Sequence, residues 1–124
     1  MSEAKLQRSP VRDGVLEAAA KMAAILPPTP LIPLEIEKTR VWVKAECLQP
    51  IGAFKIRGAW HRLSALGEEE RKRGVVAVSS GNHAQGVAWA AKRLGIAATI
   101  VMPQDAPPIK LGRTRELGAE VVTY

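Results

Sequence analysis

The sequence has few of the features that would place a protein outside the cell or in a membrane. It contains one cysteine, Cys47, so no disulfide can form within the chain, as is typical of proteins from reducing compartments. No apolar run approaches the roughly 18 residues that a membrane-spanning helix needs, and the N-terminus has no apolar stretch typical of a secretory signal. We therefore expect a cytoplasmic protein with no membrane partner.

Aromatic residues are also scarce, at 4% of the 124 residues, which limits how the net charge is interpreted. The formal charge of +6 would fit a nucleic-acid-binding protein, but such a surface needs clustered basic side chains and aromatic rings on which bases stack. Here the basic residues are spread along the chain, many near acids such as Glu68 and Glu69, so we expect no nucleic-acid partner. The G-x-G-x-x-G and Walker patterns are absent too, so a nucleotide is not the expected ligand, and no metal site is predicted.

What the chain does have is an alternation of β-type and helical segments. Hydrophobic residues make up 47% of it, enough for the core of one domain. Ser9 and Pro10 predict the start of a helix, which apolar residues at helical spacing continue to Ile25. The segments predicted after it are an extended connector through the prolines of 27–33, a strand at 40–46, a helix at 55–66, a charged extension or turn at 68–73, a strand at 75–78, a helix at 83–94, a strand at 97–102, a further helix, and a strand at 120–123.

Glycine follows each of the later helical segments, at Gly74, Gly95 and Gly118. Glycine most readily adopts the left-handed conformation that ends a helix. Short apolar strands separated by helices indicate βαβ units with a parallel sheet. The predicted fold class is therefore α/β with an open parallel sheet, in which ligands bind at the edge formed by the loops after the strands.

One lysine, Lys55, lies among small residues where a loop enters a predicted helix. Gly52 and Ala53 before it leave room for a flat ring beside the chain. A lysine traps a carbonyl compound as an imine only when desolvation or a neighbouring cation lowers its pKa, and Arg57 is a candidate for that cation. The alternative is a solvated lysine at a helix start, which is the commoner role of a lysine taken alone.

A second candidate site follows the first strand of the predicted parallel sheet. The turn S-S-G-N at 79–82 leads into a helix, so backbone N–H groups and the positive end of the helix dipole converge on a position that suits a carboxylate or phosphate. Ser79, Ser80 and Asn82 add side-chain donors, and Gly81 lets the chain come close to a ligand. Alternatively, Ser80 or Asn82 only caps the helix.

Four segments in the same order carry a resemblance to a known family. The string Q-P-I-G-A-F-K-I-R-G-A at 49–59 resembles the cofactor-lysine motif of the pyridoxal-phosphate-dependent serine/threonine dehydratases, also called threonine ammonia-lyases. The other three segments are T-P-L at 29–31, S-S-G-N-H-A-Q-G at 79–86, and M-P-Q-D-A-P at 102–107 followed by Lys110, Thr114, Arg115 and G-A-E-V at 118–121. The resemblance implies the fold type II architecture of these enzymes, similar to the β subunit of tryptophan synthase.

Details of the motifs favour the dehydratase and serine-racemase branch. Ile56 and His83 stand where cysteine synthases and threonine synthases have Asp and Thr. One departure from the resemblance is that Ile51, Gly52 and Ala53 replace the Thr-Gly-Ser that usually precedes the Phe-Lys pair. The lost hydroxyl groups would weaken contacts near the cofactor without touching the lysine itself.

The resemblance also assigns roles to individual residues. It implies that Lys55 binds pyridoxal phosphate as an imine, that Phe54 borders the cofactor ring, and that Asn82 donates a hydrogen bond to the 3′-oxygen. An amino acid substrate would displace Lys55, whose freed amine removes the α-proton, and loss of the β-hydroxyl then leads to a 2-oxo acid and ammonia. The residues implied to surround the substrate are Ser79, Ser80, Gly81, Asn82 and His83.

Two other functions stay open. Ser80 matches the residue that serves the opposite face of the α-carbon in racemase relatives, so a serine-type racemase is the nearest alternative. The other is a catalytically inactive fragment or binding module that keeps the α/β scaffold. The motifs do not choose between threonine, serine and 3-hydroxyaspartate as the substrate.

The resemblance covers the N-terminal part of such an enzyme. It implies that residues 1–50 belong to a larger domain and that 51–124 form part of a smaller α/β domain with the cofactor lysine. The family's glycine-rich phosphate loop and the partner of the pyridine nitrogen lie beyond the matched region, so we expect the isolated chain to be inactive. A homo-oligomer is expected for the complete enzyme.

Overall fold

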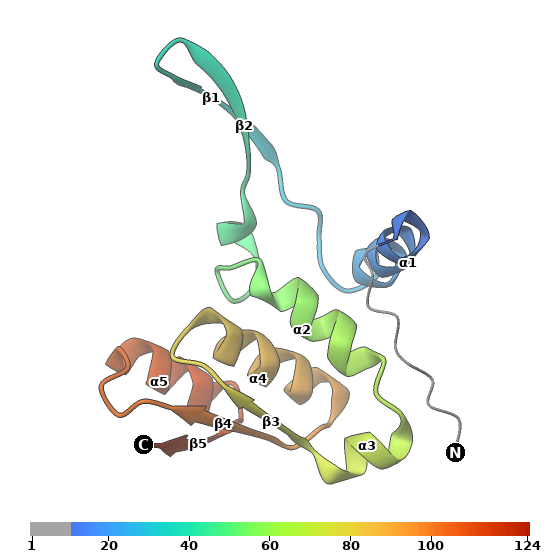
Figure 1. Cartoon of the computed structure of the whole chain (residues 1–124), viewed down its shortest axis with the longest axis vertical. Helices are drawn as coiled ribbons and strands as arrows, with labels where there is room; N and C mark the ends of the chain where they lie inside the picture. Colours follow the sequence, from blue (N-terminus) through green and yellow to red (C-terminus); the bar gives the residue numbers. More distant parts are fainter. Residues whose placement is uncertain (1–10) are drawn as a thin grey trace.

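The computed structural model describes residues 11–124, which form five α-helices, one short 3₁₀-helix and five strands (Figure 1). The helix start predicted at Ser9 and Pro10 lies outside the described residues. The first described helix, α1 (Arg12–Ala23), exposes Val15 to 59%, while Met22 near its end is partly buried against the core. No helix in residues 11–124 is long and apolar enough to cross a membrane.

An antiparallel hairpin, β1 (Leu31–Ile36) and β2 (Thr39–Lys44), projects from the body of the molecule (Figure 1). Its two turn residues, Glu37 and Lys38, have φ angles of 49° and 66°. This is the conformation of tight two-residue hairpin turns, which favour asparagine and glycine because side chains resist a positive φ.

The sequence-based expectation for this region is partly wrong. The extended connector predicted at 27–33 overlooks β1, because Pro33 is unusual within a strand and the turn lacks an Asn-Gly signal. The strand predicted at 40–46 ends early, because the chain leaves the extended conformation at Ala45 and forms the 3₁₀-helix η1 (Glu46–Leu48).

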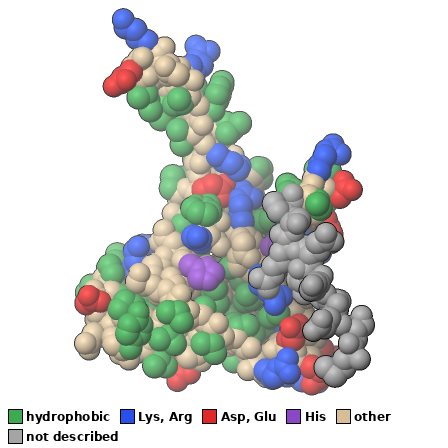
Figure 2. All heavy atoms as spheres, in the orientation of Figure 1, with side chains coloured by type: hydrophobic (Ala, Val, Ile, Leu, Met, Phe, Trp, Pro, Cys, Tyr) green, Lys and Arg blue, Asp and Glu red, His purple; other side chains and the backbone are tan. Residues whose placement is uncertain are grey.

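Apolar side chains of the hairpin face solvent. Leu31, Ile36 and Trp42 are 59%, 56% and 61% exposed, and in Figure 2 hydrophobic side chains run along the projecting arm while charged ones gather at its tip. A two-stranded hairpin is marginally stable alone in water. The hairpin therefore adds little to the core, which lies in the body.

The body contains a parallel sheet of three strands in the order β3 (Val75–Val78), β4 (Ala98–Met102) and β5 (Glu120–Thr123). The register aligns Val78 with Val101 on the neighbouring strand. The predicted α/β class with an open parallel sheet is confirmed.

Helices α4 (Asn82–Leu94) and α5 (Pro108–Glu116) connect these strands and pack on the sheet. Gly95 and Gly118 follow the two helices with φ angles of 67° and 88°, so the predicted glycine stops are confirmed there. Only glycine adopts such angles without strain. Each glycine turns the chain into the next strand, and this brings the loops that follow the strands to one edge of the sheet.

Two further helices precede the sheet: α2 (Lys55–Ser64), which packs along α4, and α3 (Glu68–Arg73), which is a separate short helix and not an extension of α2. The buried core lies largely between α2, α4 and the sheet. Trp60 of α2 meets Trp89 of α4 edge to face, with ring centroids 5.8 Å apart and planes at 66°. Ile100 of β4 is fully buried in the same core cluster.

Candidate functional site

Lys55 is the first residue of α2, directly after a turn that needs glycine. Gly52 in this turn has a φ of 70°, which other residues adopt only with strain. Phe54 is 60% exposed, and the Lys55 Nζ lies 5.1 Å from its ring centroid. The turn and the helix start therefore present an exposed amine beside an exposed aromatic ring.

Helix α4 approaches the backbone of Lys55 unusually closely. A Cβ atom placed on Gly86 would lie 3.1 Å from the Lys55 carbonyl oxygen and 3.2 Å from its carbonyl carbon. The Cβ of Ala59 would be 3.4 Å away. Because Gly86 lacks a side chain, the N-terminal turns of α2 and α4 can touch, and the segment before α4 is brought to the cofactor-lysine candidate.

The carboxylate loop, which we define as residues 79–83, comprises the three residues before α4 and the first two residues of that helix. The Oγ of Ser79 accepts hydrogen bonds of 3.2 Å from the backbone N–H groups of Gly81 and Ala84, so Ser79 caps the helix. The alternative that Ser80 or Asn82 does the capping is wrong, because neither side chain makes a cap hydrogen bond.

Capping by Ser79 leaves donors of the carboxylate loop free. Within the described chain, the backbone N–H groups of Ser80, Asn82 and His83 have no hydrogen-bond partner, and these three side chains are at least partly exposed. Three unpaired N–H groups at the start of a 13-residue helix favour an anion, through hydrogen bonds and through the helix dipole. The anion site that the sequence predicts at this loop stays a prediction.

A hollow of about 340 Å³ joins the two segments. It is lined by Phe54, Lys55 and Gly58 of the α2 region and by His83 of the carboxylate loop, with Arg57 and Ala59. Gly58 has no side chain, and no atom lies within 4 Å of the position that its Cβ would occupy, so this side of the hollow is open. The structure therefore brings the predicted lysine and the predicted anion-binding loop to one place, although α2, α3 and β3 separate them in the sequence.

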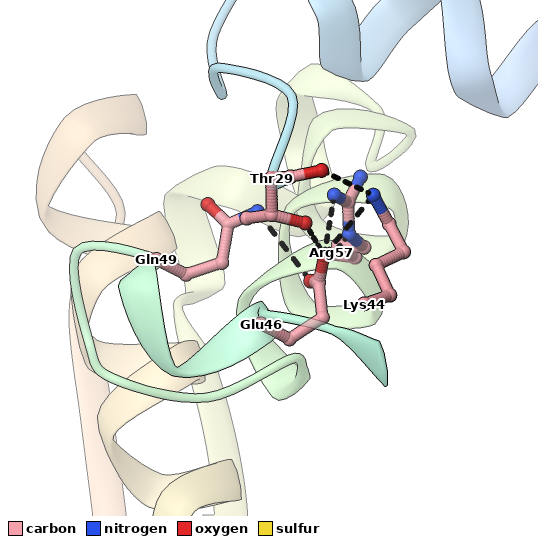
Figure 3. A network of polar contacts seen from close by, with 5 residues as sticks. All are labelled: Thr29, Lys44, Glu46, Gln49 and Arg57. Carbon is pink, nitrogen blue, oxygen red and sulfur yellow. Dashed lines mark hydrogen bonds and ion pairs between the residues drawn. The ribbon is translucent and has the colours of Figure 1, made fainter. Parts of the chain in front are cut away.

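The guanidinium group of Arg57 is held in a cluster around Glu46 (Figure 3). Its Nε and Nη2 atoms donate to the two carboxylate oxygens of Glu46 at 2.6 and 2.8 Å. Thr29 and Gln49 also donate to this carboxylate, and the Lys44 Nζ lies 3.6 Å from it. The Glu46 cluster, meaning these five residues, ties the hairpin base to the first turns of α2.

The Glu46 cluster corrects one expectation about Lys55. The sequence suggested Arg57 as the cation that lowers the pKa of Lys55, but the charge of Arg57 is neutralised by a two-pronged ion pair with Glu46. Its role is to hold the start of α2. Sequence reasoning missed Glu46 because the pair joins residues 11 positions apart on opposite sides of a turn.

Replacing Glu46 with glutamine is expected to lower the free energy of unfolding by roughly 1.5 kcal/mol near neutral pH, because Arg57 loses its counter-charge in a partly buried site. Urea unfolding measures this change in the free energy of unfolding. The experiment uses the intact protein, which means the complete polypeptide that the cell makes. The matched control is Glu69→Gln, which removes an ion pair at 2.8 Å whose acid is 78% exposed. That control should change stability by less than about 0.5 kcal/mol.

The same substitution has an expected pH dependence. The hydrogen bond from Arg57 lowers the pKa of Glu46 from 4.5 to about 2. Because the folded-state pKa lies below the unfolded-state value, the stabilisation is complete above about pH 4.5 and is lost as the pH falls towards 2. The stability difference between parent and Glu46→Gln should therefore shrink below pH 4.5, and a difference that stays constant there would contradict the assigned pair.

Comparison with protein families identifies relatives for most of the chain. A family model described as "Pyridoxal-phosphate dependent enzyme" matches residues 23–124. The L-threonine ammonia-lyase of Thermotoga maritima is 58% identical over 88 residues, which are 71% of this chain and 22% of that protein. The L-threo-3-hydroxyaspartate ammonia-lyase of a Pseudomonas species is 50% identical over 114 residues, covering 89% of this chain and 36% of that protein.

Solved structures agree with this result. Maize serine racemase superimposes with a TM-score of 0.83 at 40% identity, over 90% of this chain and 35% of the racemase. The processed form of threonine deaminase isoform 2 from Solanum lycopersicum gives a TM-score of 0.75 at 36% identity, over 94% and 34% of the two chains. The chain therefore spans between about a fifth and just over a third of the length of these relatives.

Proposed function

Since the chain belongs to the family of pyridoxal-phosphate-dependent enzymes, we propose that it carries the cofactor lysine and the substrate-carboxylate loop of an ammonia-lyase that acts on a β-hydroxy amino acid. The observation that carries the proposal is that Lys55 and His83 of the carboxylate loop border one hollow. The relatives named as threonine and 3-hydroxyaspartate ammonia-lyases support the reaction class. The substrate is accordingly an amino acid with a hydroxyl group on its β-carbon.

The residues at the hollow fit the aldehyde and ring of pyridoxal phosphate. Lys55 offers a primary amine for the aldehyde carbon, Phe54 offers an apolar face, and Gly58 leaves one wall without a side chain. The Asn82 side chain is exposed and makes no hydrogen bond that caps α4, so its amide group is free to donate to the 3′-oxygen of the cofactor ring. When bound, the cofactor supplies an electron sink that acidifies the α-hydrogen of an amino acid.

Lys55 has two tasks in this proposal. Its amine would hold the cofactor covalently, and the freed amine would be the general base that accepts the α-hydrogen of the substrate. Lys55 is the first residue of α2 and directly follows a turn, so its side chain is free to do both. The fixed backbone keeps the amine near the hollow after release.

The carboxylate loop orients the substrate for this proton transfer. The free N–H groups of Ser80, Asn82 and His83 bind the α-carboxylate, and their rigid attachment to α4 fixes the direction of the bound amino acid. His83 lines the hollow and lies beside the substrate, without a base role of its own. The β-hydroxyl group would then take up a proton and leave as water, and hydrolysis of the resulting enamine by one water molecule would give a 2-oxo acid and ammonia.

Racemisation is a second candidate because of Ser80. Its hydroxyl is exposed and not used for capping, so it can deliver a proton to the face of the α-carbon opposite Lys55. The similarity to a serine racemase supports this candidate. By family, the intact protein is also proposed to be a homo-oligomer, and the single cysteine among these 124 residues favours a cytoplasmic location.

Substitutions at Ser80 and Asn82 separate the two candidates. Ser80→Ala is expected to reduce racemisation of L-serine by about 10²-fold or more while ammonia release from threonine changes little, because elimination needs no acid on the opposite face. Asn82→Ala is expected to slow both reactions and to shift the visible absorption of the bound cofactor. The two rates are measured on the intact protein, by chiral chromatography and by an ammonia assay.

Equal losses of both activities in Ser80→Ala would remove the proton-donor role of Ser80. An unchanged cofactor spectrum in Asn82→Ala would show that the side chain does not contact the ring oxygen. Ser64→Ala is the matched control for the serine, because its hydroxyl only donates to the backbone oxygen of His61 within α2.

A further inference from the structure

We propose that Lys110 is a specificity-determining residue that binds the same substrate carboxylate as the carboxylate loop. This inference rests on the proposed function, since it adds a cation to the site where that function places the carboxylate. Lys110 belongs to the first turns of α5, which is separated from the carboxylate loop by α4 and β4 in the sequence. Neither the amine of Lys55 nor the loop itself supplies this charge.

The position of the ammonium group carries the inference. The Lys110 Nζ lies 3.2 Å from the point where a Cβ of Gly81 would be, so the ammonium group rests against the middle of the carboxylate loop. Gly81 has no side chain to separate the two. A carboxylate bound to the N–H groups of Ser80 and Asn82, on either side of Gly81, lies within reach of Nζ.

The surroundings leave the Lys110 charge uncompensated. Lys110 is half-buried, and within residues 11–124 its Nζ makes neither an ion pair nor a hydrogen bond. Helix α5 also carries Arg113, Arg115 and Glu116, and Asp105 precedes it, but neither acid forms an ion pair with Lys110, and the carboxylate loop adds His83 and no acid. A half-buried ammonium group without a counter-ion favours an anionic ligand, and charge-assisted hydrogen bonds are stronger than neutral ones.

The backbone holds Lys110 in this position. The Lys110 N–H donates to the Pro107 carbonyl at 2.8 Å, and the Lys110 carbonyl accepts a 2.7 Å hydrogen bond from the hydroxyl of Thr114, which is fully buried. The first turn of α5 is therefore anchored from both sides. The side chain is directed to the carboxylate loop from a fixed backbone, as a specificity residue requires.

The test measures kinetics of the intact protein with Lys110→Met, Lys110→Arg and the control Lys92→Met, which removes an exposed lysine from the last turn of α4. Lys110→Met should raise KM for L-threonine about tenfold with a small change in kcat, because the carboxylate loses one charge-assisted contact. Lys110→Arg should recover most of the loss, and Lys92→Met should match the parent.

A substrate analogue makes the test specific for the carboxylate. L-Threonine amide, which lacks the negative charge, should inhibit the parent weakly, and its inhibition constant should stay within about twofold in Lys110→Met. An equal weakening of threonine and its amide would overturn the proposal, because it would indicate a structural role. A rise in KM for 3-hydroxyaspartate without one for threonine would also overturn it, since the cation would then bind the side-chain carboxylate.

The outcomes distinguish this inference from the proposed function. A parent protein that binds pyridoxal phosphate but releases no ammonia from any hydroxy amino acid would overturn the function and with it the role of Lys110. A parent that releases ammonia, together with an unaltered KM in Lys110→Met, would overturn only the role of Lys110. Circular dichroism of the variants checks that α5 is retained.

Discussion

Replacing Lys55 with alanine in the intact protein is expected to abolish both covalent attachment of pyridoxal phosphate and ammonia release. The methyl group of alanine can neither bond to the cofactor's aldehyde nor accept the α-proton. Loss of a general base alone lowers rates by about 10²- to 10⁴-fold, and loss of the covalent site adds to it. Visible absorption of the bound cofactor and an ammonia assay with threonine measure the two effects.

Lys72→Ala is the control for this substitution. Lys72 belongs to α3, is 60% exposed and forms ion pairs with Glu68 and Glu69 on its own helix, so its loss should leave cofactor and activity unchanged. Retention of the covalent cofactor spectrum in Lys55→Ala would place the cofactor lysine elsewhere. A parent protein that binds the cofactor through Lys55 but processes no amino acid would favour the alternative of an inactive binding module.

Replacing Gly86 with alanine is expected to destabilise the intact protein by about 2 kcal/mol and to lower kcat by about tenfold. The new methyl group would lie 3.1 Å from the Lys55 carbonyl oxygen, a backbone atom that moves only with the first turn of α2. Overpacking of this kind costs about 1–3 kcal/mol, which exceeds the roughly 1 kcal/mol that alanine gains over glycine within a helix. Displacing Lys55 from the carboxylate loop also misaligns the groups that move the α-proton.

Gly112 provides the matched control, because it is also a helical glycine but has no atom within 4 Å of its Cβ position. Gly112→Ala should stabilise the protein by up to about 1 kcal/mol and leave kcat unchanged. Thermal or urea unfolding with steady-state kinetics measures both variants. If Gly86→Ala were as stable as Gly112→Ala, the close approach of α4 to Lys55 would not limit the packing.

The sequence predicts the sheet and most helix ends because these depend on local signals. Gly95 and Gly118 are required by the left-handed conformation that ends a helix, and the apolar strands around them leave few other arrangements. The hairpin lacks such a signal. Its turn places Glu37 and Lys38 in a conformation that these residues adopt only when strand pairing holds them there, so the contacts across the hairpin decide the structure.

In the candidate site, too, some features follow from local sequence signals and others depend on contacts that form only in the folded protein. Lys55 and the carboxylate loop are predicted from short motifs, each with its own chemistry. The partner of Arg57, the capping role of Ser79 and the position of Lys110 depend on where side chains point after folding. Two neighbouring serines are equivalent in the sequence, and only the folded structure shows that Ser79 is the one that caps α4. The roles assigned to the site residues stay predictions.

The packing interface between helices α2 and α4, called here the seam, limits how the two helices can move relative to one another. Gly86 meets Lys55 at one end of the seam, and Trp60 meets Trp89 edge to face further along it. Two helices held at two separate points can turn relative to one another only about the line that joins those points. We therefore expect Lys55 and the start of α4 to move together, because a shift of one helix along the other would break one of the two contacts.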